Sequence, residues 1–591
     1  MSELLKSQYD SVFSKPLTRL RVEDQNEFFM REPQNLINTS LSDVILTPND
    51  FEQAINDMPM HSAPGPDSWN SVFIKNCKKP LSRAFSILWR GSMDTGVVPQ
   101  LLKTTDIAPL HKGGSKATAK NYRPIALTSH IIKIFERVLR SKITTHLETH
   151  QLHNPGQHGF RTGRSCLSQL LDHYDKVLNA LEDKKNADVI YTDFAKAFDK
   201  CDHGVIAHKM RAKGITGKVG RWIYNFLTNR TQRVVVNRVK SEAATVKSSV
   251  PQGTVLAPIL FLILISDIDK DVSHSTVSSF ADDTRICMTV SSIADTSKLQ
   301  ADINQIFQWA AENNMKFNDE KFQLLRYGKH EEIKSSSEYK TNSGHTIERN
   351  TNVKDLGVIM SEDLTFKDHN IVSIASARKM TGWIMRTFKT REAKPMMTLF
   401  RSLVLSRLEY CCTLTAPFKA GEIADLENVQ RTFTARITEI KHLNYWERLR
   451  FLNLYSLERR RERYMIIYTW KILEGLVPNL HTKITHYESK RLGRRCTIPP
   501  MKSRGVTSTL RDHTISVRGP RLFNCLPAHI RGITNRPLAV FKLALDKHLK
   551  SVPDQPGCGS YVGLRAASSN SLVDQALIHQ EAWSQTGPRG R

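Results

Sequence analysis

The chain has few cysteines, and they are scattered. Nine occur in 591 residues, and only Cys411 and Cys412 lie close together. This spacing fits neither a disulfide framework nor the paired CxxC pattern of a zinc site. We therefore expect a protein of a reducing compartment.

Long apolar segments are also scarce. The first residues, MSELLKSQYD, have no apolar stretch behind a basic start, so no secretory signal is indicated. The longest apolar run, Val255–Ile265, contains Pro258 and is about half as long as the ~20 residues that a membrane-spanning helix needs. We expect no membrane span, and we interpret this run as part of the core.

Acidic residues are outnumbered by basic ones. Lys and Arg total 85 and Asp and Glu total 58, which gives a formal net charge of +27. The 40% of hydrophobic and 8% of aromatic residues are ordinary values for a globular protein and exclude a disordered chain or a fibre. The excess positive charge attracts polyanions such as nucleic acid or acidic membranes. The simpler alternative is a basic soluble protein.

Three carboxylates occupy positions where chemistry is expected. Asp193 follows the β-prone run Val189–Tyr191, and the residues after it have helical spacing. Farther along, Asp282 and Asp283 lie in a short polar turn between two β-prone runs, which predicts a hairpin. If these elements pair, the carboxylates meet at one sheet edge and favour hard divalent cations, above all Mg²⁺. Two such ions about 4 Å apart suit nucleotidyl transfer.

Another reading of these three residues needs no chemistry. Two adjacent Asp are common in a hairpin turn, and Asp is a frequent helix N-cap, which would explain Asp193. Spacing alone favours neither reading.

The motifs around these residues form an ordered series. YTDFAKAFD, VPQGTVLAP and FADD occur in that order, preceded by NYRPIALTS and QHGFRTGRS and followed by NNMKFNDEK and KDLGVIM. This series resembles the reverse transcriptase of non-LTR (LINE-type) retrotransposons. SLVLSRLEYC, IADLENVQRTFTARI, YSLERRRERY and VRGPRLFNCLP resemble the C-terminal region of Jockey-type elements, so the resemblance covers roughly residues 40 to 550.

The resemblance implies an α+β right-hand polymerase, with fingers, a palm built on a small antiparallel sheet, and a helical thumb. We expect five regions: an N-terminal helical extension (1–90), fingers and palm (91–360), a helical thumb (361–480), a basic C-terminal region (481–550) and a disordered tail (551–591).

The resemblance also implies a reaction and its partners. The chain would be an RNA-directed DNA polymerase that extends a DNA 3′-hydroxyl on an RNA template with dNTPs and two Mg²⁺ ions, with Mn²⁺ as the alternative. The DNA would be a primer or a nicked target, and the enzyme would act as a ribonucleoprotein in the nucleus and cytoplasm. The alternative from another class is a catalytically silent RNA-binding relic.

The motifs of this family also indicate which residues of this sequence would bind the metal ions and the nucleotide. The resemblance implies that Asp193, the backbone carbonyl of Phe194, Asp282 and Asp283 hold the metal ions, with Asp282 the better direct ligand. For dNTP binding it implies Lys112, Arg123, Phe198, Gln252, Gly253 and Lys321.

Each nucleotide-site residue has an expected role. Lys112 and Arg123 would neutralise the phosphates, and Lys321 would protonate the leaving pyrophosphate; for both lysines a solvent-facing position is the alternative. The ring of Phe198 would exclude a 2′-hydroxyl, although a plain core position is open too. In the VPQG motif, Gly253 would let the backbone approach the template base or nucleotide.

Two further expectations concern the C-terminal half and the start of the chain. Phosphate contacts with the template–primer duplex are expected from six arginines of the thumb: Arg431, Arg436, Arg459, Arg460, Arg461 and Arg463. Elements of this type usually carry an endonuclease before the polymerase, and only about 60 residues precede APGPD. We therefore expect a chain that lacks the endonuclease, either as a separate open reading frame or as a fragment, with a separate endonuclease as one candidate partner.

Overall fold

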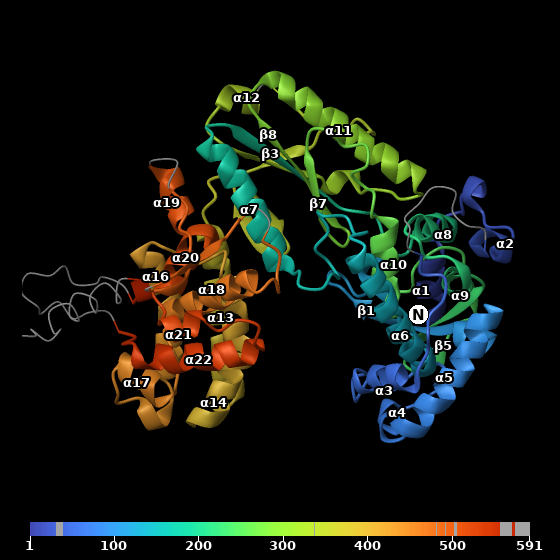
Figure 1. The fold of residues 1–591 in the computed structure, drawn as a ribbon, viewed down its shortest axis with the longest axis horizontal. Coiled ribbons are helices and arrows are strands. Elements are labelled where there is room, and N and C mark those ends of the chain that lie inside the picture. The colour runs from blue at the N-terminus through green and yellow to red at the C-terminus, as the bar shows by residue number, and fades with distance from the viewer. Residues whose placement is uncertain are drawn as a thin grey trace, which may run out of the picture.

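The computed structural model describes residues 1–30, 40–335, 337–479, 482–490, 492–500, 505–555 and 570–573. The N-terminal elements and most C-terminal helices form two lobes, which lie on the right and the left of Figure 1. A sheet that contains β3, β7 and β8 joins the lobes at the top of this view.

The first sheet belongs to the N-terminal lobe. Its strand order is β2-β1-β4-β5, with β6 paired to β4, and β1 runs antiparallel to β2 but parallel to β4. The strands are β1 (Thr104–His111), β2 (Tyr122–Leu127), β4 (Arg230–Val236), β5 (Val239–Lys240) and β6 (Ala244–Val246). The helices of this lobe are α1 (Ser2–Asp10), α2 (Gln25–Met30), α3 (Pro48–Asn56), α4 (Ser71–Asn76), α5 (Lys78–Thr95), α6 (His130–Thr149), α8 (His203–Ala212), α9 (Gly217–Leu227) and α10 (Ala257–Leu264).

The second sheet carries the predicted carboxylates. Its order is β10-β9-β3-β8-β7, and β3 lies at the centre, antiparallel to both β8 and β9. The strands are β3 (Asn186–Thr192), β7 (Thr276–Phe280), β8 (Asp283–Val290), β9 (Gln323–Tyr327) and β10 (Glu348–Asn350). β7 and β8 form an antiparallel hairpin, which confirms the hairpin predicted around Asp282 and Asp283.

Both faces of the second sheet are buried, each in a different core. Because successive side chains of a strand point to opposite faces, β3 contributes to both cores. One face packs with the N-terminal lobe and carries Ile190, Ile286 and Leu324. The opposite face packs with α7 (Cys166–Glu182) and with C-terminal helices, and it carries Val189, Cys287 and Leu325. The remaining helices before the C-terminal lobe are α11 (Ile293–Glu312) and α12 (Glu331–Ser335).

The first 90 residues do not form a separate extension. Phe51 of α3 is fully buried and stacks on Phe135 of α6 with ring centroids 6.2 Å apart. Trp89 of α5 stacks on the same ring at 4.5 Å. These contacts place α3 and α5 in one core with elements predicted to belong to the fingers and palm. The boundary predicted at residue 90 therefore runs through a packed core.

The C-terminal lobe is mainly helical. Its helices are α13 (Lys367–Thr387), α14 (Ala393–Leu399), α15 (Ser406–Leu408), α16 (Ala420–Thr434), α17 (Tyr445–Phe451), α18 (Leu457–Leu473), α19 (Val506–Asp512), α20 (Ile515–Asn524), α21 (Ala528–Arg531) and α22 (Leu538–Ser551), with a π-helical turn Phe400–Leu405 between α14 and α15. Two hairpins complete it: β11 (Asn352–Asp355) with β12 (Val358–Ser361), and β13 (His486–Ser489) with β14 (Gly493–Cys496).

The predicted boundary at residue 480 also lies within a core. Trp470 of α18 is fully buried and stacks on Phe541 of α22 with centroids 4.7 Å apart. Most of residues 506–551 are helical, in α19, α20, α21 and α22, and Pro520 lies inside α20.

The predicted disordered tail is partly ordered. Residues 570–573 pack on α18, where Leu572 is buried and its backbone N–H donates to Glu462 at 2.8 Å. The rest of that prediction, residues 556–569 and 574–591, lies outside the described residues. Among the helices that the structure describes, none is both long and apolar enough to cross a membrane.

Candidate active site

The second sheet brings the three predicted carboxylates to one end of two neighbouring strands. β3 ends at Thr192, directly before Asp193, and Thr192 pairs with Thr284 of β8. Asp282 lies in the two-residue turn of the β7–β8 hairpin, and Asp283 is the first residue of β8. The strand pairing that the sequence could only suggest is therefore present in the structure.

The hairpin turn is held in place by the QHGF motif. Ala281 has a φ of 57°, a left-handed conformation that is uncommon for alanine. Its N–H donates to the side chain of Gln157 at 3.1 Å, and His158 N–H donates to the carbonyl of Ser279 at 2.8 Å. A Cβ on Gly159 would lie 2.5 Å from the backbone nitrogen of Ala281, so only glycine fits there. The motif thus supports the turn that carries Asp282.

The pKa values of the hairpin carboxyls show that the three acids interact. Desolvation, followed by the negative charges of Asp282 and Asp193, raises the pKa of Asp283 to about 6. Desolvation and the charge of Asp193 also raise the pKa of Asp282. Like charges that share a site repel one another, and a bound cation would relieve this repulsion.

Positive side chains surround the carboxylates. Lys321 Nζ donates to Asp193 Oδ2 at 2.6 Å. The pKa of Lys112 is lowered by desolvation and then by the positive charges of Lys196, Arg123 and Lys321. The structure thus brings together Lys112, Arg123 and Lys321, which come from distant parts of the sequence. It adds Lys196, which the sequence reasoning missed although it lies within the YTDFAKAFD motif.

The donor set suits a hard divalent cation, but the acids are not arranged as a ready metal site. Carboxylate oxygens are the ligands that Mg²⁺ and Mn²⁺ prefer. Across the described parts of the chain, no three His, Cys, Asp or Glu side chains are grouped so that they could hold a metal ion. Here Lys321 supplies the positive charge next to Asp193.

Phe194 is mainly a core residue through its side chain. Its ring is 4% exposed and stacks on Phe317 with centroids 4.3 Å apart. The neighbouring backbone is tied to the same segment, because Asn318 N–H donates to the carbonyl of Asp193 at 2.8 Å and Ala195 N–H donates to that of Lys316. These contacts fix the turn after β3, on which Asp193 lies.

Phe198 and the PQG motif lie beside this turn. The half-buried ring of Phe198 stacks on Phe261 with centroids 4.6 Å apart, so it is rigidly held. The carbonyl of Gln252 accepts a hydrogen bond from Ala126 N–H of β2 at 2.6 Å. Gly253 has a φ of 112°, and a Cβ there would lie 2.7 Å from the Ala126 carbonyl oxygen. The close approach that requires glycine is therefore to a strand of the first sheet.

Two of the six arginines predicted to contact nucleic acid are wrong. Arg459 is 0% exposed, and its guanidinium donates to the carbonyls of Pro553 and Asn570 at 3.0 Å. Arg461 is 7% exposed and donates to the carbonyls of Leu457 and Leu408. Their donors point into the protein, so they cannot reach a phosphate without unfolding α18.

The other four arginines differ from one another. Arg460 forms an ion pair with Glu409, and Arg463 forms one with Asp546, so both are engaged within the fold. Arg431 and Arg436 of the α16 region are exposed, and Arg431 lies over the ring of Tyr445 at 4.9 Å. Only Arg431 and Arg436 keep the accessibility that the prediction requires.

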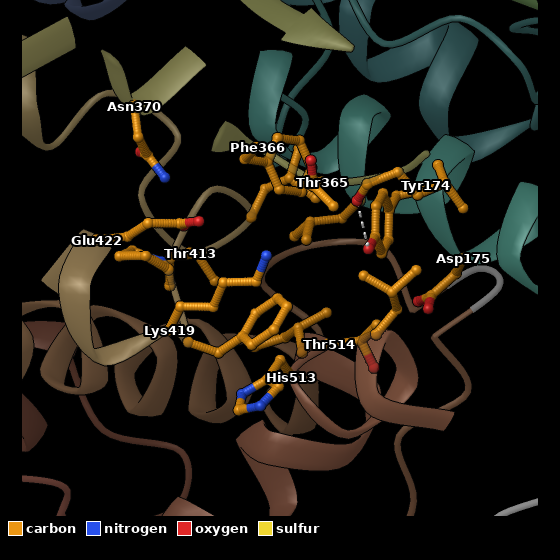
Figure 2. A pocket seen from close by; sticks show the side chains of 18 residues that line it. Tyr174, Asp175, Thr365, Phe366, Asn370, Thr413, Lys419, Glu422, His513 and Thr514 are labelled. Carbon is orange, nitrogen blue, oxygen red and sulfur yellow. Dashed lines mark hydrogen bonds between the residues drawn. The ribbon is translucent and has the colours of Figure 1, made fainter. Parts of the chain in front are cut away.

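A cavity of about 220 Å³ opens beside the carboxylates. One part of its wall contains Asp193, Asp283 and Lys321, and another is formed by residues 353–356 of the β11–β12 hairpin. A second cavity, shown in Figure 2, lies between α7, the loop before α16 and the α19–α20 segment. Tyr174, whose hydroxyl donates to the Leu364 carbonyl at 3.1 Å, belongs to that second cavity, which none of the predicted site residues line.

Comparison with known families agrees with this geometry. Residues 110–360 match the model of the family described as reverse transcriptase (RNA-dependent DNA polymerase). Residues 110–360 are a reverse transcriptase domain. The reverse transcriptase domain contains all three carboxylates and the four surrounding cations, and it ends within β12.

Curated relatives of the reverse transcriptase domain come from mobile elements. The chain is 27% identical over 333 residues to the RNA-directed DNA polymerase from mobile element jockey of Drosophila melanogaster, which covers 55% of this chain and 36% of that protein. It is 23% identical over 431 residues to the probable RNA-directed DNA polymerase from transposon X-element of the same species, covering 69% and 46%. The matched segments therefore span less than half the length of these relatives.

Proposed function

We propose that this chain is the RNA-directed DNA polymerase of a non-LTR retrotransposon, which extends a DNA 3′-hydroxyl on an RNA template. The observation that carries this proposal is the placement of Asp193, Asp282 and Asp283 at one end of β3 and β8, close enough to interact electrostatically, with several lysines and Arg123 nearby. Acids alone would suit many metal-dependent reactions. The added cations suit a substrate that brings several negative charges, such as a nucleoside triphosphate.

Reverse transcriptases generally use divalent metal ions. In this chain, Asp193, Asp282 and Asp283 would hold two ions, with Mg²⁺ the natural choice and Mn²⁺ the alternative. When bound, such ions lower the pKa of an attacking hydroxyl and stabilise the leaving oxygen. The raised pKa values of Asp282 and Asp283 fit this assignment: burial is the largest cause and the charge of Asp193 adds to it, so a bound cation would stabilise both ionised carboxylates.

The surrounding cations have separate tasks in this proposal. Lys112 directly follows β1, Arg123 lies on the paired strand β2, and both would neutralise the outer phosphates. Lys196 lies four residues after β3 and would add its positive charge to theirs. Lys321, which contacts Asp193, is placed to donate a proton to the leaving pyrophosphate. RNA template and DNA primer would be attracted by the net charge of +27.

Primer extension on a homopolymeric RNA template tests the proposal. We expect incorporation of deoxynucleotides by the purified chain in Mg²⁺ and none after a chelator is added. Restored synthesis on adding back the divalent ion would exclude damage by the chelator. If the chain binds RNA in a salt-sensitive way but extends no primer in Mg²⁺ or Mn²⁺, the RNA-binding relic is the correct interpretation.

Phe198 should control the choice of sugar. Replacing it with Ala removes a rigid ring, so incorporation of ribonucleotides relative to deoxynucleotides should rise by about tenfold or more, equivalent to about 1.4 kcal/mol of discrimination. Competing dNTP and rNTP in primer extension gives this ratio directly. Phe198→Tyr, which keeps the ring, is the matched control. A variant with lower stability but an unchanged ratio would show that Phe198 is only a core residue.

A further inference from the structure

A short segment near the C-terminus is seated on α18. Asn570, Ser571 and Leu572 are all buried, with exposed fractions between 4% and 6%. Leu572 belongs to the same hydrophobic core as Trp470 of α18. Residues 556–569 separate this segment from the loop that follows α22. The segment is therefore a distinct element docked on the C-terminal lobe and not a continuation of α22.

Two acids of α18 bind the N–H and O–H groups of this segment. Glu458 accepts a hydrogen bond from the backbone N–H of Asn570 at 3.1 Å. Glu462 accepts one from the hydroxyl of Ser571 at 2.7 Å and one from the N–H of Leu572 at 2.8 Å. Because Glu458 and Glu462 are four residues apart, both lie on the same face of the helix. This face therefore offers carboxylate acceptors to consecutive donors of a peptide.

An arginine next to the acids binds the carbonyl groups of the peptide. The guanidinium of Arg459 donates to the carbonyl of Asn570 and to that of Pro553, each at 3.0 Å. A peptide backbone thus meets both acceptors and a donor here, and Leu572 adds an apolar anchor. The two carboxylates would repel a phosphate, so the chemistry of this face suits a peptide and not a nucleic acid.

The peptide-binding side chains are also held by contacts that do not involve the segment. Glu462 accepts a hydrogen bond from Arg518 of α20 at 3.0 Å, and Arg459 has a second carbonyl acceptor in the loop after α22. That loop is fixed to the start of α18, because the N–H of Ser456 donates to Asp554 at 2.6 Å. These contacts would persist if the segment left, so the face is preformed.

The charges of the face favour a ligand that supplies hydrogen-bond donors. Desolvation and the charge of Glu462 raise the pKa of Glu458 to about 7, whereas the N–H of Asn570 and the charge of Arg518 oppose this rise. The segment supplies three donors to the two acids. Without these donors, two like charges would face each other in a poorly solvated place. An emptied face should therefore take up a peptide again.

We propose that Glu458, Arg459 and Glu462 form a peptide-docking site and that the chain's own segment 570–573 is its detachable ligand. The docked segment is short, and opening so small an element costs far less than unfolding a lobe. The site recognises the backbone of the segment through hydrogen bonds and its identity through the buried Leu572. This inference does not depend on polymerase activity.

Binding of a separate peptide to an emptied site tests the proposal. In the full chain, Leu572→Asp places a carboxylate in an apolar core and near Glu462, so the segment should leave the site. A fluorescently labelled peptide of residues 566–577 should then bind this variant, as measured by anisotropy. A tethered segment has an effective concentration of about 1 mM, so one that is docked about ten times more often than free implies a dissociation constant below about 0.1 mM. The unchanged chain, whose site is filled, should bind the peptide at least ~tenfold more weakly.

Further substitutions show whether the peptide binds at the proposed site. Glu462→Gln, added to the Leu572→Asp chain, removes a charged acceptor and should weaken peptide binding at least ~tenfold. Asp425→Asn, which changes an exposed acid of α16, is the matched control and should leave binding unaltered. A peptide that itself carries Leu572→Asp should not bind. Equal binding of both peptides, equal binding to the filled and the emptied site, or no binding at about 1 mM peptide would overturn the proposal.

Hydrogen exchange in the unchanged chain tests the same proposal without any variant. After correction for intrinsic rates, the amides of Asn570 and Leu572 should exchange at least ~100-fold faster than those of Ile466 and Ile467, which lie in the buried part of α18. Equal protection of all four amides would mean that the segment leaves only when the lobe unfolds, and the proposal would then be wrong. Neither experiment needs catalysis, so a chain that fails to extend primers would overturn the proposed function alone.

Discussion

Primer extension by the Asp193→Asn variant should fall at least ~10³-fold below that of the unchanged chain. The substitution keeps the shape of the side chain and an oxygen that can accept from Lys321, but it removes the negative charge that a divalent ion requires. Several kcal/mol of transition-state stabilisation depend on such an ion, and each 1.36 kcal/mol is tenfold in rate. The measurement is the extension rate at saturating template, primer and dNTP.

The controls for Asp193→Asn exclude general damage. Glu320→Gln removes an exposed carboxylate next to Lys321 and should leave the rate unchanged. Salt-sensitive RNA binding by Asp193→Asn should persist, because it depends on the distributed positive charge. Full activity of the Asp193→Asn variant would contradict both the metal assignment and the proposed function.

The Phe51→Ala variant should lose about 3–5 kcal/mol of stability, the usual cost of removing a fully buried ring. Phe51 lies outside the reverse transcriptase domain, yet it packs on Phe85 and Phe135 of neighbouring helices. The free energy of unfolding by urea measures the loss. Phe73→Ala is the matched control, because that ring is 53% exposed and its removal should cost less than about 0.5 kcal/mol.

If Phe51→Ala does not lower the stability, the prediction of an N-terminal extension would be supported. If Phe51→Ala and Phe73→Ala changed stability equally little, α3 would not contribute to the common core. The expected result instead makes α3 part of the core that supports the N-terminal lobe and the residues predicted to bind nucleotide.

The site was the most predictable part of the molecule, because its signals are local. The β-prone runs before Asp193 and on both sides of Asp282 and Asp283 predict strands and a hairpin, and β3, β7 and β8 confirm them. The charge contacts around the site were not predictable, because they join residues that are distant in the sequence. Asp355 meets Arg285 across 70 positions, and Lys196 approaches Lys112 and Arg123 only after folding.

The arginines of α18 show why the sequence misleads. Runs of charge usually face solvent, so Arg459 and Arg461 suggest a phosphate-binding surface. Their acceptors are backbone carbonyls of Pro553, Asn570 and Leu408, which lie far away in the sequence. No local sequence pattern predicts hydrogen bonds to such distant carbonyl groups. The packing across residues 90 and 480 was not predictable for the same reason, since it involves rings that are distant in the chain.

The placement of the second sheet between two cores has a consequence for cooperativity. Val189 contributes to one hydrophobic core and its neighbour Ile190 to the other. Ile190 lies only three residues before Asp193. Melting either core would expose one side of β3 to water. The three carboxylates therefore cannot stay assembled after one lobe has unfolded, and under the proposed function loss of activity on heating should coincide with unfolding of the two lobes.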